Sequence, residues 1–502
     1  MTKEKNMTRR QFVGTATAAS AFTIVPRSVL GGPGRTAPSD RLNLAYIGCG
    51  TQGLREMADL LKNEDVQITS VCDPNLYSTD YVDWSLHGIR GAIRDTLGDP
   101  SWGEGLTGIP GGRKVGQEFV EKYYAGKKGG SYSGCKAYAD FREQLDKETG
   151  IDAVKVMTPD HLHAAVSLAA MAKGKHVVIH KPLANRMHEA RKVMEAAAKP
   201  GISTHLLAWS ERSGLKVALD WIRGGAIGTL KEIHNWSNRP MWQQWTALPK
   251  EQPPVPDGLD WDLWLGPVPH RPYHPNFTHA VFRGWYDFGG GSIADMGHYS
   301  LWPLFLTFGI DTPPLWARAY GSTTCLIENH VSRPENNTAA FPGACQVEFD
   351  FPAQKELPAF RLYWYDGGMK PRTPDELDAD GGELTREGMM FVGDKGKILA
   401  DFRGENPRII PEKDMISFTG KADPPEEVTD RADRTWIDAF KEGKPSPGSF
   451  TLARAVTETI LLGGVALRAG KKVVYDSAAM KITNLPEANQ YLVREYRKGW
   501  EI

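Results

Sequence analysis

Residues Leu42–Gly53 read L-N-L-A-Y-I-G-C-G-T-Q-G, a short apolar run that opens directly into a glycine-rich turn. Gly48, Gly50 and Gly53 have G-x-G-x-x-G spacing. In such turns the first glycine permits a tight bend, the second lets the backbone approach a pyrophosphate, and the third lets the next helix pack on the strand. The pattern therefore predicts a strand, a turn and a helix from about Thr51 to Lys62.

A second apolar strand is expected over Val66–Cys72, and it ends on Asp73. A carboxylate there accepts hydrogen bonds from a ribose 2′-hydroxyl and repels a 2′-phosphate, which favours NAD over NADP. The free N–H groups at the start of the helix suit a pyrophosphate. The predicted cofactor-binding residues of this unit are Gly48, Cys49, Gly50, Thr51, Gln52, Gly53 and Asp73. The alternative is a glycine-rich turn in a doubly wound sheet that binds no ligand.

The N-terminus has the layout of a twin-arginine export signal. Met7–Gly14 read M-T-R-R-Q-F-V-G, small and apolar residues follow over Thr15–Val25, and a Pro/Gly/Ser-rich spacer reaches Asp40. This layout predicts export by the twin-arginine machinery and a periplasmic location. A disordered basic N-terminus is the alternative. No later segment has the roughly 18 uninterrupted apolar residues of a membrane span, so no stable span is expected.

Bulk composition narrows the class of protein. The chain has 502 residues and a net charge of −1, with no basic patch, which argues against nucleic acid as a partner. The five cysteines lack metal-ligand spacing, so no metal site is expected. The length suggests two or more domains.

The first half of the chain alternates strands with helices. Strands are expected over 151–157, 175–180 and 202–209, and helices over 140–148, 161–173 and 184–198. This rhythm predicts a parallel sheet covered on both faces. Residues 74–135 are too long for an ordinary crossover, and we expect a surface elaboration near the site.

After residue 211 the pattern changes to runs of strands with helices beside them. Helices are expected over 213–223, 292–308, 434–442 and 452–468, with several strands between 315 and 401. The predicted fold class is α/β: a Rossmann domain with a doubly wound parallel sheet, plus a C-terminal α+β domain with an open, largely antiparallel sheet. The predicted units are a signal and spacer (1–38), the NAD-binding domain (39–210) and a substrate-binding and oligomerisation domain (211–502).

Two loops at the ends of predicted parallel strands contain candidate catalytic and cofactor-binding residues, because ligands bind at that edge of such sheets. Lys181 in H-K-P can donate to a substrate oxygen or transfer a proton, unless it is simply a solvated lysine before a helix. In T-P-D-H-L-H, residues Thr158, Pro159, His161 and His163 are expected to contact the cofactor together with Lys181. One of these histidines can instead cap or pack.

A third feature is the helix that follows G-G-G-S. There Asp295 faces both His298 (i+3) and Tyr299 (i+4), so the carboxylate can orient either residue as a proton relay. Spacing alone leaves that choice open. A helix with an ordinary polar face is the alternative.

Aromatic residues gather in the same part of the chain, where nine of the fifteen tryptophans fall between Trp209 and Trp302. Such rings stack on sugar faces, but they also serve as core anchors. Trp242, Trp245 and Trp285 are the candidates for a ligand wall. Arg239 and Arg283 are the candidates to hold a carboxylate or hydroxyls.

Five motifs in order resemble the Gfo/Idh/MocA oxidoreductase family. They are G-C-G-T-Q-G, T-P-D-H-L-H, H-K-P-L, G-L-D-W-D-L-W-L-G-P (Gly258–Pro267) and G-G-G-S-I-A-D-M-G-H-Y. The resemblance implies a Rossmann domain followed by a domain whose open sheet lines a sugar site. It also implies that Lys181 acts in proton transfer or substrate positioning, and that the protein is a homo-oligomer, a dimer or tetramer.

Two positions depart from the usual family pattern. His180 stands where the family has glutamate, which changes the electrostatic neighbour of Lys181. Tyr299 stands where many members have histidine. The resulting D-x-G-x-Y pattern is similar to that of glucose–fructose oxidoreductase. The resemblance therefore favours Tyr299 as the acid/base, with His298 as the second candidate.

The combined expectation is an exported oxidoreductase that acts on a sugar or glycoside. No NAD pool is expected outside the cytoplasm, so the cofactor must stay bound and be restored within the cycle. One alternative is an NAD-dependent glycosidase or epimerase with no net redox change. Another is an inactive sugar-binding relative, for which His180 is the main support.

Overall fold

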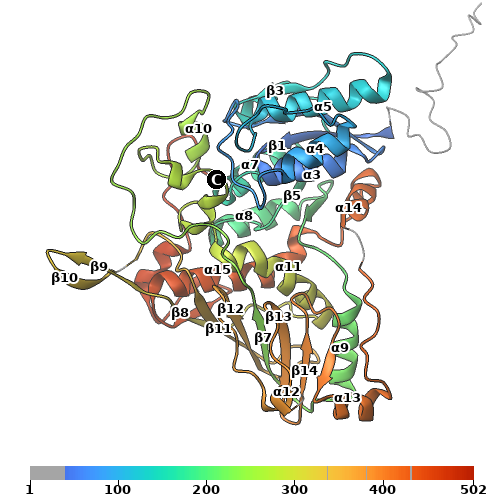
Figure 1. The fold of residues 1–502 in the computed structure, drawn as a ribbon, viewed down its shortest axis with the longest axis vertical. Helices are drawn as coiled ribbons and strands as arrows, with labels where there is room; N and C mark the ends of the chain where they lie inside the picture. Colours follow the sequence, from blue (N-terminus) through green and yellow to red (C-terminus); the bar gives the residue numbers. More distant parts are fainter. Residues whose placement is uncertain (1–39, 336, 380, 430–431) are drawn as a thin grey trace, which may run out of the picture.

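The computed structural model describes residues 40–335, 337–379, 381–429 and 432–502. The twin-arginine pair, Arg9 and Arg10, lies outside the described residues. Figure 1 shows two halves, each built around its own sheet, with helices at their junction. The predicted fold class is confirmed in both halves.

The first sheet is parallel throughout, in the order β3-β2-β1-β4-β5-β6. Its strands are β1 (Leu42–Ile47), β2 (Val66–Cys72), β3 (Lys136–Tyr138), β4 (Ala153–Val156), β5 (His176–Ile179) and β6 (Thr204–Leu206). These runs are almost continuously buried because helices cover both faces. The strand order reverses direction between β1 and β4, and ligands of such sheets bind at that point, beyond the carboxyl ends.

Six helices accompany this sheet. They are α3 (Thr51–Leu61), α4 (Gly88–Leu97), α5 (Arg113–Lys128), α6 (Phe141–Lys147), α7 (His163–Ala172) and α8 (Met187–Ala197). The helix expected over 161–173 is split into the 3₁₀ turn η2 (Asp160–Leu162) and α7. The helix expected from residue 184 starts only at Met187. The insertion after β2 contains α4 and α5, which pack on the sheet and on α3.

The second sheet has nine strands in the order β15-β14-β13-β7-β12-β11-β8-β16-β17. They are β7 (Leu230–Trp236), β8 (Trp316–Gly321), β11 (Cys345–Phe351), β12 (Phe360–Tyr365), β13 (Gly388–Gly393), β14 (Lys397–Ala400), β15 (Arg408–Ile410), β16 (Val473–Asp476) and β17 (Lys481–Ile482). Only β7 and β12 pair in parallel. The sheet is therefore open and largely antiparallel, as predicted.

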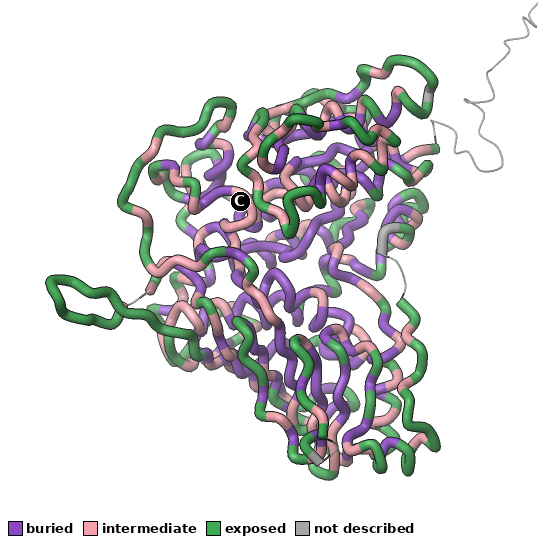
Figure 2. Tube along the Cα trace, viewed as in Figure 1, coloured by how far each residue is buried: buried purple, intermediate pink, exposed green. Residues whose placement is uncertain are grey.

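Helices at the junction connect the two halves. α11 (Gly291–Phe308) packs on α9 (Ser213–Arg223) and on α15 (Arg454–Ala469), and α15 contacts both β11 and α8. Figure 2 shows that the buried core runs through this junction without a break. The segment Phe450–Ala469 is long and apolar enough to cross a membrane, but 72% of it is buried inside the protein, as in a core helix.

The remaining elements are short. They are α10 (Trp261–Leu265), η3 (Pro275–Phe277), η4 (His279–Gly284), β9 (Thr324–Glu328), β10 (Val331–Glu335), α12 (Asp375–Ala379), α13 (Glu412–Thr419), α14 (Ala432–Lys441), η5 (Phe450–Ala453) and η6 (Pro486–Tyr491). β9 and β10 form a hairpin that projects from the molecule (Figure 1). α14 returns to the first half, where it contacts β1 and β6.

Candidate active site

The glycine turn has no room for other residues at two positions. Gly48 has a φ of +104°, and a Cβ there would lie 2.5 Å from the Met157 carbonyl. A Cβ on Gly53 would lie 2.2 Å from the Gly48 oxygen. Helix α3 then starts after Gly50 with no side-chain cap and no acidic residue in its first turn. This end of the helix is therefore suited to an anion such as a pyrophosphate.

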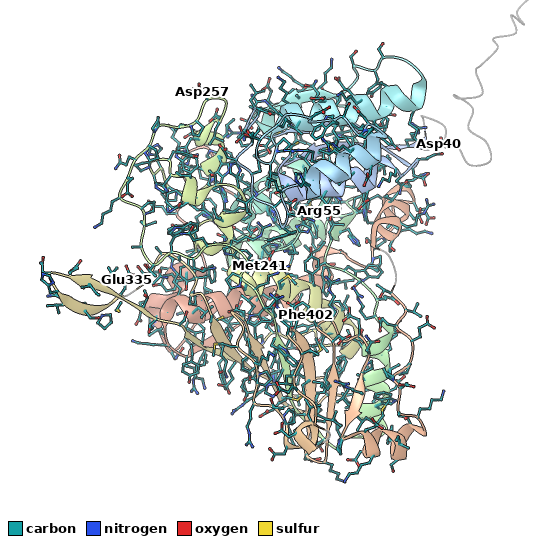
Figure 3. All side chains as sticks on the ribbon, viewed as in Figure 1. Asp40, Arg55, Met241, Asp257, Glu335 and Phe402 are labelled. Atoms are coloured by element: carbon teal, nitrogen blue, oxygen red, sulfur yellow. The ribbon has the colours of Figure 1, made fainter. Side chains whose placement is uncertain are left out.

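A cleft opens at the carboxyl ends of the parallel strands. Its wall combines the glycine turn with parts of 73–84, 157–162 and 278–283. Nine of the predicted cofactor-binding residues lie on this wall: Gly48, Gly50, Thr51, Gln52, Gly53, Asp73, Thr158, Pro159 and Lys181. Arg55, labelled in Figure 3, also lines the cleft. The cleft lies where a dinucleotide is expected to bind.

Asp73 lies buried on the wall, at the end of β2. Its Oδ2 accepts a hydrogen bond from the Cys49 amide at 2.8 Å, and its Oδ1 accepts one from the Asn75 amide at 2.9 Å. Burial raises the pKa of Asp73 to about 6, although the two amides oppose that shift. The backbone thus holds the carboxylate at the place where a ribose is expected.

Three predicted cofactor contacts are not on the wall. The Cys49 side chain is packed in the core, and its amide is used by Asp73. Both ring nitrogens of His161 face backbone carbonyls, those of Phe288 and Trp264. Those of His163 face the carbonyls of Pro182 and Thr158. This corrects the expectation for both histidines, because their rings brace neighbouring loops instead of facing the cleft.

A buried ionic cluster lies at the other end of the cleft. Lys181 Nζ donates to Asp295 Oδ1, and Arg283 Nε donates to the same oxygen at 3.2 Å. Burial alone would raise the pKa of Asp295, but Lys181 and Arg283 hold it below its ordinary value. Asp295 is therefore ionised at neutral pH and fixes both cations at the wall.

Tyr299 has a different partner from the one that helix spacing suggests. Its hydroxyl shares a 2.8 Å hydrogen bond with His180 Nε2, and the Lys181 ammonium lies 4.9 Å from its ring centre. Asp295 accepts from neither Tyr299 nor His298. This corrects the expectation that Asp295 orients one of them, because the carboxylate is already engaged by Lys181 and Arg283.

His298 belongs to the core. It is fully buried, its Nδ1 lies 3.2 Å from the Ala294 carbonyl, and its ring is not part of the cleft wall. The structure therefore brings Lys181, Asp295, Tyr299 and His180 together. Lys181 and His180 are on the cleft wall, Asp295 and Tyr299 are hydrogen-bonded to them, and His298 is bonded instead to its own helix.

The predicted substrate-binding residues divide into two groups. Arg283 lies on the cleft wall, and the guanidinium of Arg239 stacks 5.0 Å from the ring centre of Trp84, another wall residue. The tryptophans proposed as a ligand wall are packed instead. Trp285 stacks on Trp245 and is 1% exposed. Trp242 is buried beside Gly284, so these three rings act as core anchors.

Several wall residues were not predicted from the sequence. Tyr81 and Trp84 come from the insertion after Asp73, and His279 comes from η4 in the second half. The rings of Tyr81 and His279 meet at 3.9 Å. The position of 74–84 directly after a parallel strand was a usable signal, because loops at that edge surround the ligand. No sequence signal marked His279.

Fold and cleft together define a two-domain oxidoreductase architecture with a dinucleotide-binding first half. Two parts of the chain match models of the Gfo/Idh/MocA oxidoreductase family. Residues 120–206 match the model of its NAD-binding Rossmann fold, and residues 220–317 match that of its C-terminal alpha/beta domain. The first half is accordingly an NAD-binding Rossmann domain.

Individual relatives match over shorter stretches. A levoglucosan dehydrogenase of Pseudarthrobacter phenanthrenivorans is 36% identical over 113 residues, 22% of this chain and 27% of the relative. A glycosyl hydrolase family 109 protein of Stenotrophomonas maltophilia is 24% identical over 228 residues, 45% of this chain and 41% of the relative. The aligned stretches thus span well under half of either relative.

Solved structures share the fold across most of the chain. The WlbA dehydrogenase of Chromobacterium violaceum, solved with NADH and UDP-GlcNAcA, has a TM-score of 0.50 and 14% sequence identity. The comparison covers 88% of this chain and 98% of that protein. At this level of identity the likeness establishes the fold alone.

Proposed function

We propose that this protein is an exported, NAD-dependent oxidoreductase that acts on a sugar or glycoside and retains its cofactor. The observation that carries the proposal is the composition of the cleft. A pyrophosphate-type turn and Asp73 lie at one end, and a buried group of proton-handling side chains lies at the other. When bound, NAD accepts a hydride from a carbon that bears a secondary hydroxyl.

The side chains at the reactive end have separate roles in this proposal. Lys181, whose pKa is lowered by burial although Asp295 opposes that shift, donates a hydrogen bond to the substrate oxygen. Tyr299 takes the proton of the hydroxyl that is oxidised. The phenol passes its own proton to His180 Nε2, which lies 2.8 Å away. His180 is thus the partner of the Tyr299 hydroxyl at the position where the family has a carboxylate, with a pKa lowered by burial and by the charges of Lys181 and Arg283.

Retention of the cofactor is supported by a strap over the cleft, residues 74–84. Its start is fixed to the second half by backbone hydrogen bonds, from Leu76 N to Gly258 O (2.8 Å) and from Asp260 N to Pro74 O (3.1 Å). Its end is fixed by ring contacts, Tyr81 with His279 and Trp84 with Arg239. A strap pinned on both sides of the cleft slows release of a bound dinucleotide. Slow release suits a protein that the twin-arginine pathway carries in folded form.

The test follows deuterium from the substrate. The purified protein, with its own dinucleotide, is incubated with sugars deuterated at single ring carbons, and the released dinucleotide is analysed by mass spectrometry. We expect deuterium in the dinucleotide from one ring position of an accepted sugar. Binding of sugars without deuterium transfer from any position would contradict the proposal and favour an inactive sugar-binding relative.

The second candidate is an NAD-dependent glycosidase or epimerase with no net redox change. The 228-residue match to a protein named as a glycosyl hydrolase favours it. Lys181 and Tyr299 would then assist both the oxidation and the return of the hydride. Release of the aglycone from an aryl glycoside without any external acceptor would favour this candidate. An accumulating keto sugar that requires an acceptor would favour the first.

A further inference from the structure

We propose that the sugar accepted by this site carries a carboxylate, as a uronic acid or its glycoside does. This inference rests on the proposed function and names its substrate class. Its basis is two guanidinium groups, those of Arg239 and Arg403, near the reactive side chains, which no carboxylate of the described residues pairs with.

The carboxylates of the ionic cluster already have partners. Asp295 is shared by Lys181 and Arg283. Asp160, which also interacts electrostatically with Lys181 and Arg283, accepts a hydrogen bond from the Gly290 amide at its Oδ2 (3.1 Å). Glu56 pairs with Lys155. The acids near Tyr299 are thus committed to other partners.

Arg403 adds a further positive charge at Tyr299. Its guanidinium carbon lies 5.0 Å from the centre of the Tyr299 ring, in a cation–π arrangement. The neighbouring Glu405 accepts from the Arg403 backbone amide and pairs with Arg212 instead. Among residues 40–335, 337–379, 381–429 and 432–502, no side-chain acceptor engages the Arg403 guanidinium.

Arg239 provides the second guanidinium group without a carboxylate partner, beside Trp84. Its guanidinium stacks on the Trp84 ring and contacts the Met241 sulfur, which is a weak acceptor. The Arg239 Nε is buried and has no hydrogen-bond partner in the described part of the chain. Arg239 is also one of the cations that, after Lys181 and Arg283, lower the pKa of Asp295 against the effect of burial. It therefore belongs electrostatically to the same site.

A buried N–H donor without an acceptor raises the free energy of the protein, and a ligand that supplies the acceptor removes this penalty. Arginine held flat against a ring keeps its N–H edge free, and that edge matches the two oxygens of a carboxylate. In Figure 3 the labelled Met241 and Phe402, close in sequence to these arginines, lie toward the junction of the two halves. We infer that Arg239 and Arg403 hold the acid group while Lys181 and Tyr299 handle the hydroxyl.

The experiment compares matched sugars on the purified, cofactor-loaded protein. Methyl glucoside and methyl galactoside are paired with the corresponding methyl uronides, and kcat/KM is measured for each. We expect the uronides to exceed their neutral partners by about 10-fold or more. Arg239→Met and Arg403→Met should each lower the ratio of kcat/KM for the uronide to kcat/KM for its neutral partner by about 10-fold or more.

Arg372→Met is the matched control, because the Arg372 side chain is 86% exposed and, among the described residues, its ion pair is with Asp375. It should change none of these values. Neutral sugars that react as well as uronides, or arginine variants that weaken both equally, would overturn the inference while the proposed function stands. If no sugar reacts, the proposed function fails, and calorimetric binding still decides the inference. Tighter binding of uronides, lost in both arginine variants, would support it, and equal binding would overturn it.

Discussion

Asp73 shows how a position in the sequence and an environment in the fold combine in one residue. The position, at the end of the second strand, predicted an acid facing a ribose. The structure adds that the carboxylate is buried and held by the amides of Cys49 and Asn75. Burial raises the pKa of Asp73 to about 6, so its charge changes within an accessible pH range.

This pKa predicts a pH-dependent affinity for NAD. Ionised Asp73 accepts hydrogen bonds from ribose more strongly than the protonated acid, so affinity should be highest above about pH 6 and fall below it. The folding stability of the protein without NAD depends on pH in the opposite direction. Because the folded pKa exceeds the unfolded one, stability from this group is complete below the unfolded value of 3.8 and is lost as the pH rises through about 6.

Titration of stripped protein with NADH from pH 5 to 8, followed by fluorescence, measures the affinity. Asp73→Asn should bind about 10-fold more weakly at pH 8 and lose the pH dependence. An unchanged pH profile in the variant would show that Asp73 is not the group responsible.

The His180–Tyr299 pair predicts a specific non-additivity. Tyr299→Phe and His180→Gln should each lower kcat by about 10²-fold or more, and the double variant should lose little beyond the worse single variant. The reason is that His180 acts through the Tyr299 hydroxyl.

His188→Gln is the control for this cycle, since His188 lies on α8, away from the cleft wall. It should leave kcat and its pH profile unchanged. Fully additive losses in the double variant would mean that His180 and Tyr299 act independently.

At the scale of elements, the sequence predicted which helices and strands form better than it predicted which side chains contact one another. The helix expected over 292–308 is α11, and its spacing does place Asp295 and Tyr299 one turn apart. However, their hydrogen-bond partners come from the loop after β5 and from η4. Those partners depend on how the two halves pack, which no local periodicity encodes. The same limit explains why the tryptophans, rich in one segment, were misread as a ligand wall.

The strap of residues 74–84 carries the prediction at this scale. Trp84→Ala removes the stacking with Arg239 and one end of the strap's attachment, so release of bound dinucleotide should accelerate by about 10-fold or more. Dilution of loaded protein into a dehydrogenase trap for free NAD measures the rate. Leu86→Ala, an exposed residue of the same insertion, should leave it unchanged. Equal rates of dinucleotide release from the two variants would show that the strap does not slow release.

On the scale of the molecule, the two halves are not separable by a cut in the sequence. Trp436, Ile437 and Phe440 of α14 belong to the same buried cluster as Leu44 and Tyr46 of β1, although nearly four hundred positions separate them in the chain. The predicted domain boundary at residue 210 lies where the strand–helix pattern of the sequence changes, but α14, which packs in the core of the first half, comes after that boundary. Sequence periodicity cannot show such a return, because α14 resembles any amphipathic helix.

Trp436 is fully buried, so Trp436→Ala should destabilise the protein by about 3–5 kcal/mol and lower the midpoint of thermal unfolding. The loss should extend to NAD affinity, since β1 leads into the glycine turn. Phe418→Ala is the control, because Phe418 is 44% exposed on α13. A Trp436→Ala protein as stable as the control variant would show that α14 is not part of the first core.

The central claim is that this cleft holds a nicotinamide dinucleotide through export and turnover. The most direct test is to purify the protein without added nucleotide, dialyse it extensively, denature it and quantify the released molecule by mass spectrometry and absorbance. The account predicts about one NAD or NADH per chain, and a markedly lower amount from Trp84→Ala prepared in parallel. A chain that is empty after dialysis would contradict it, even if added NAD binds weakly, and a chain that binds neither NAD nor NADH would contradict the proposed function as a whole.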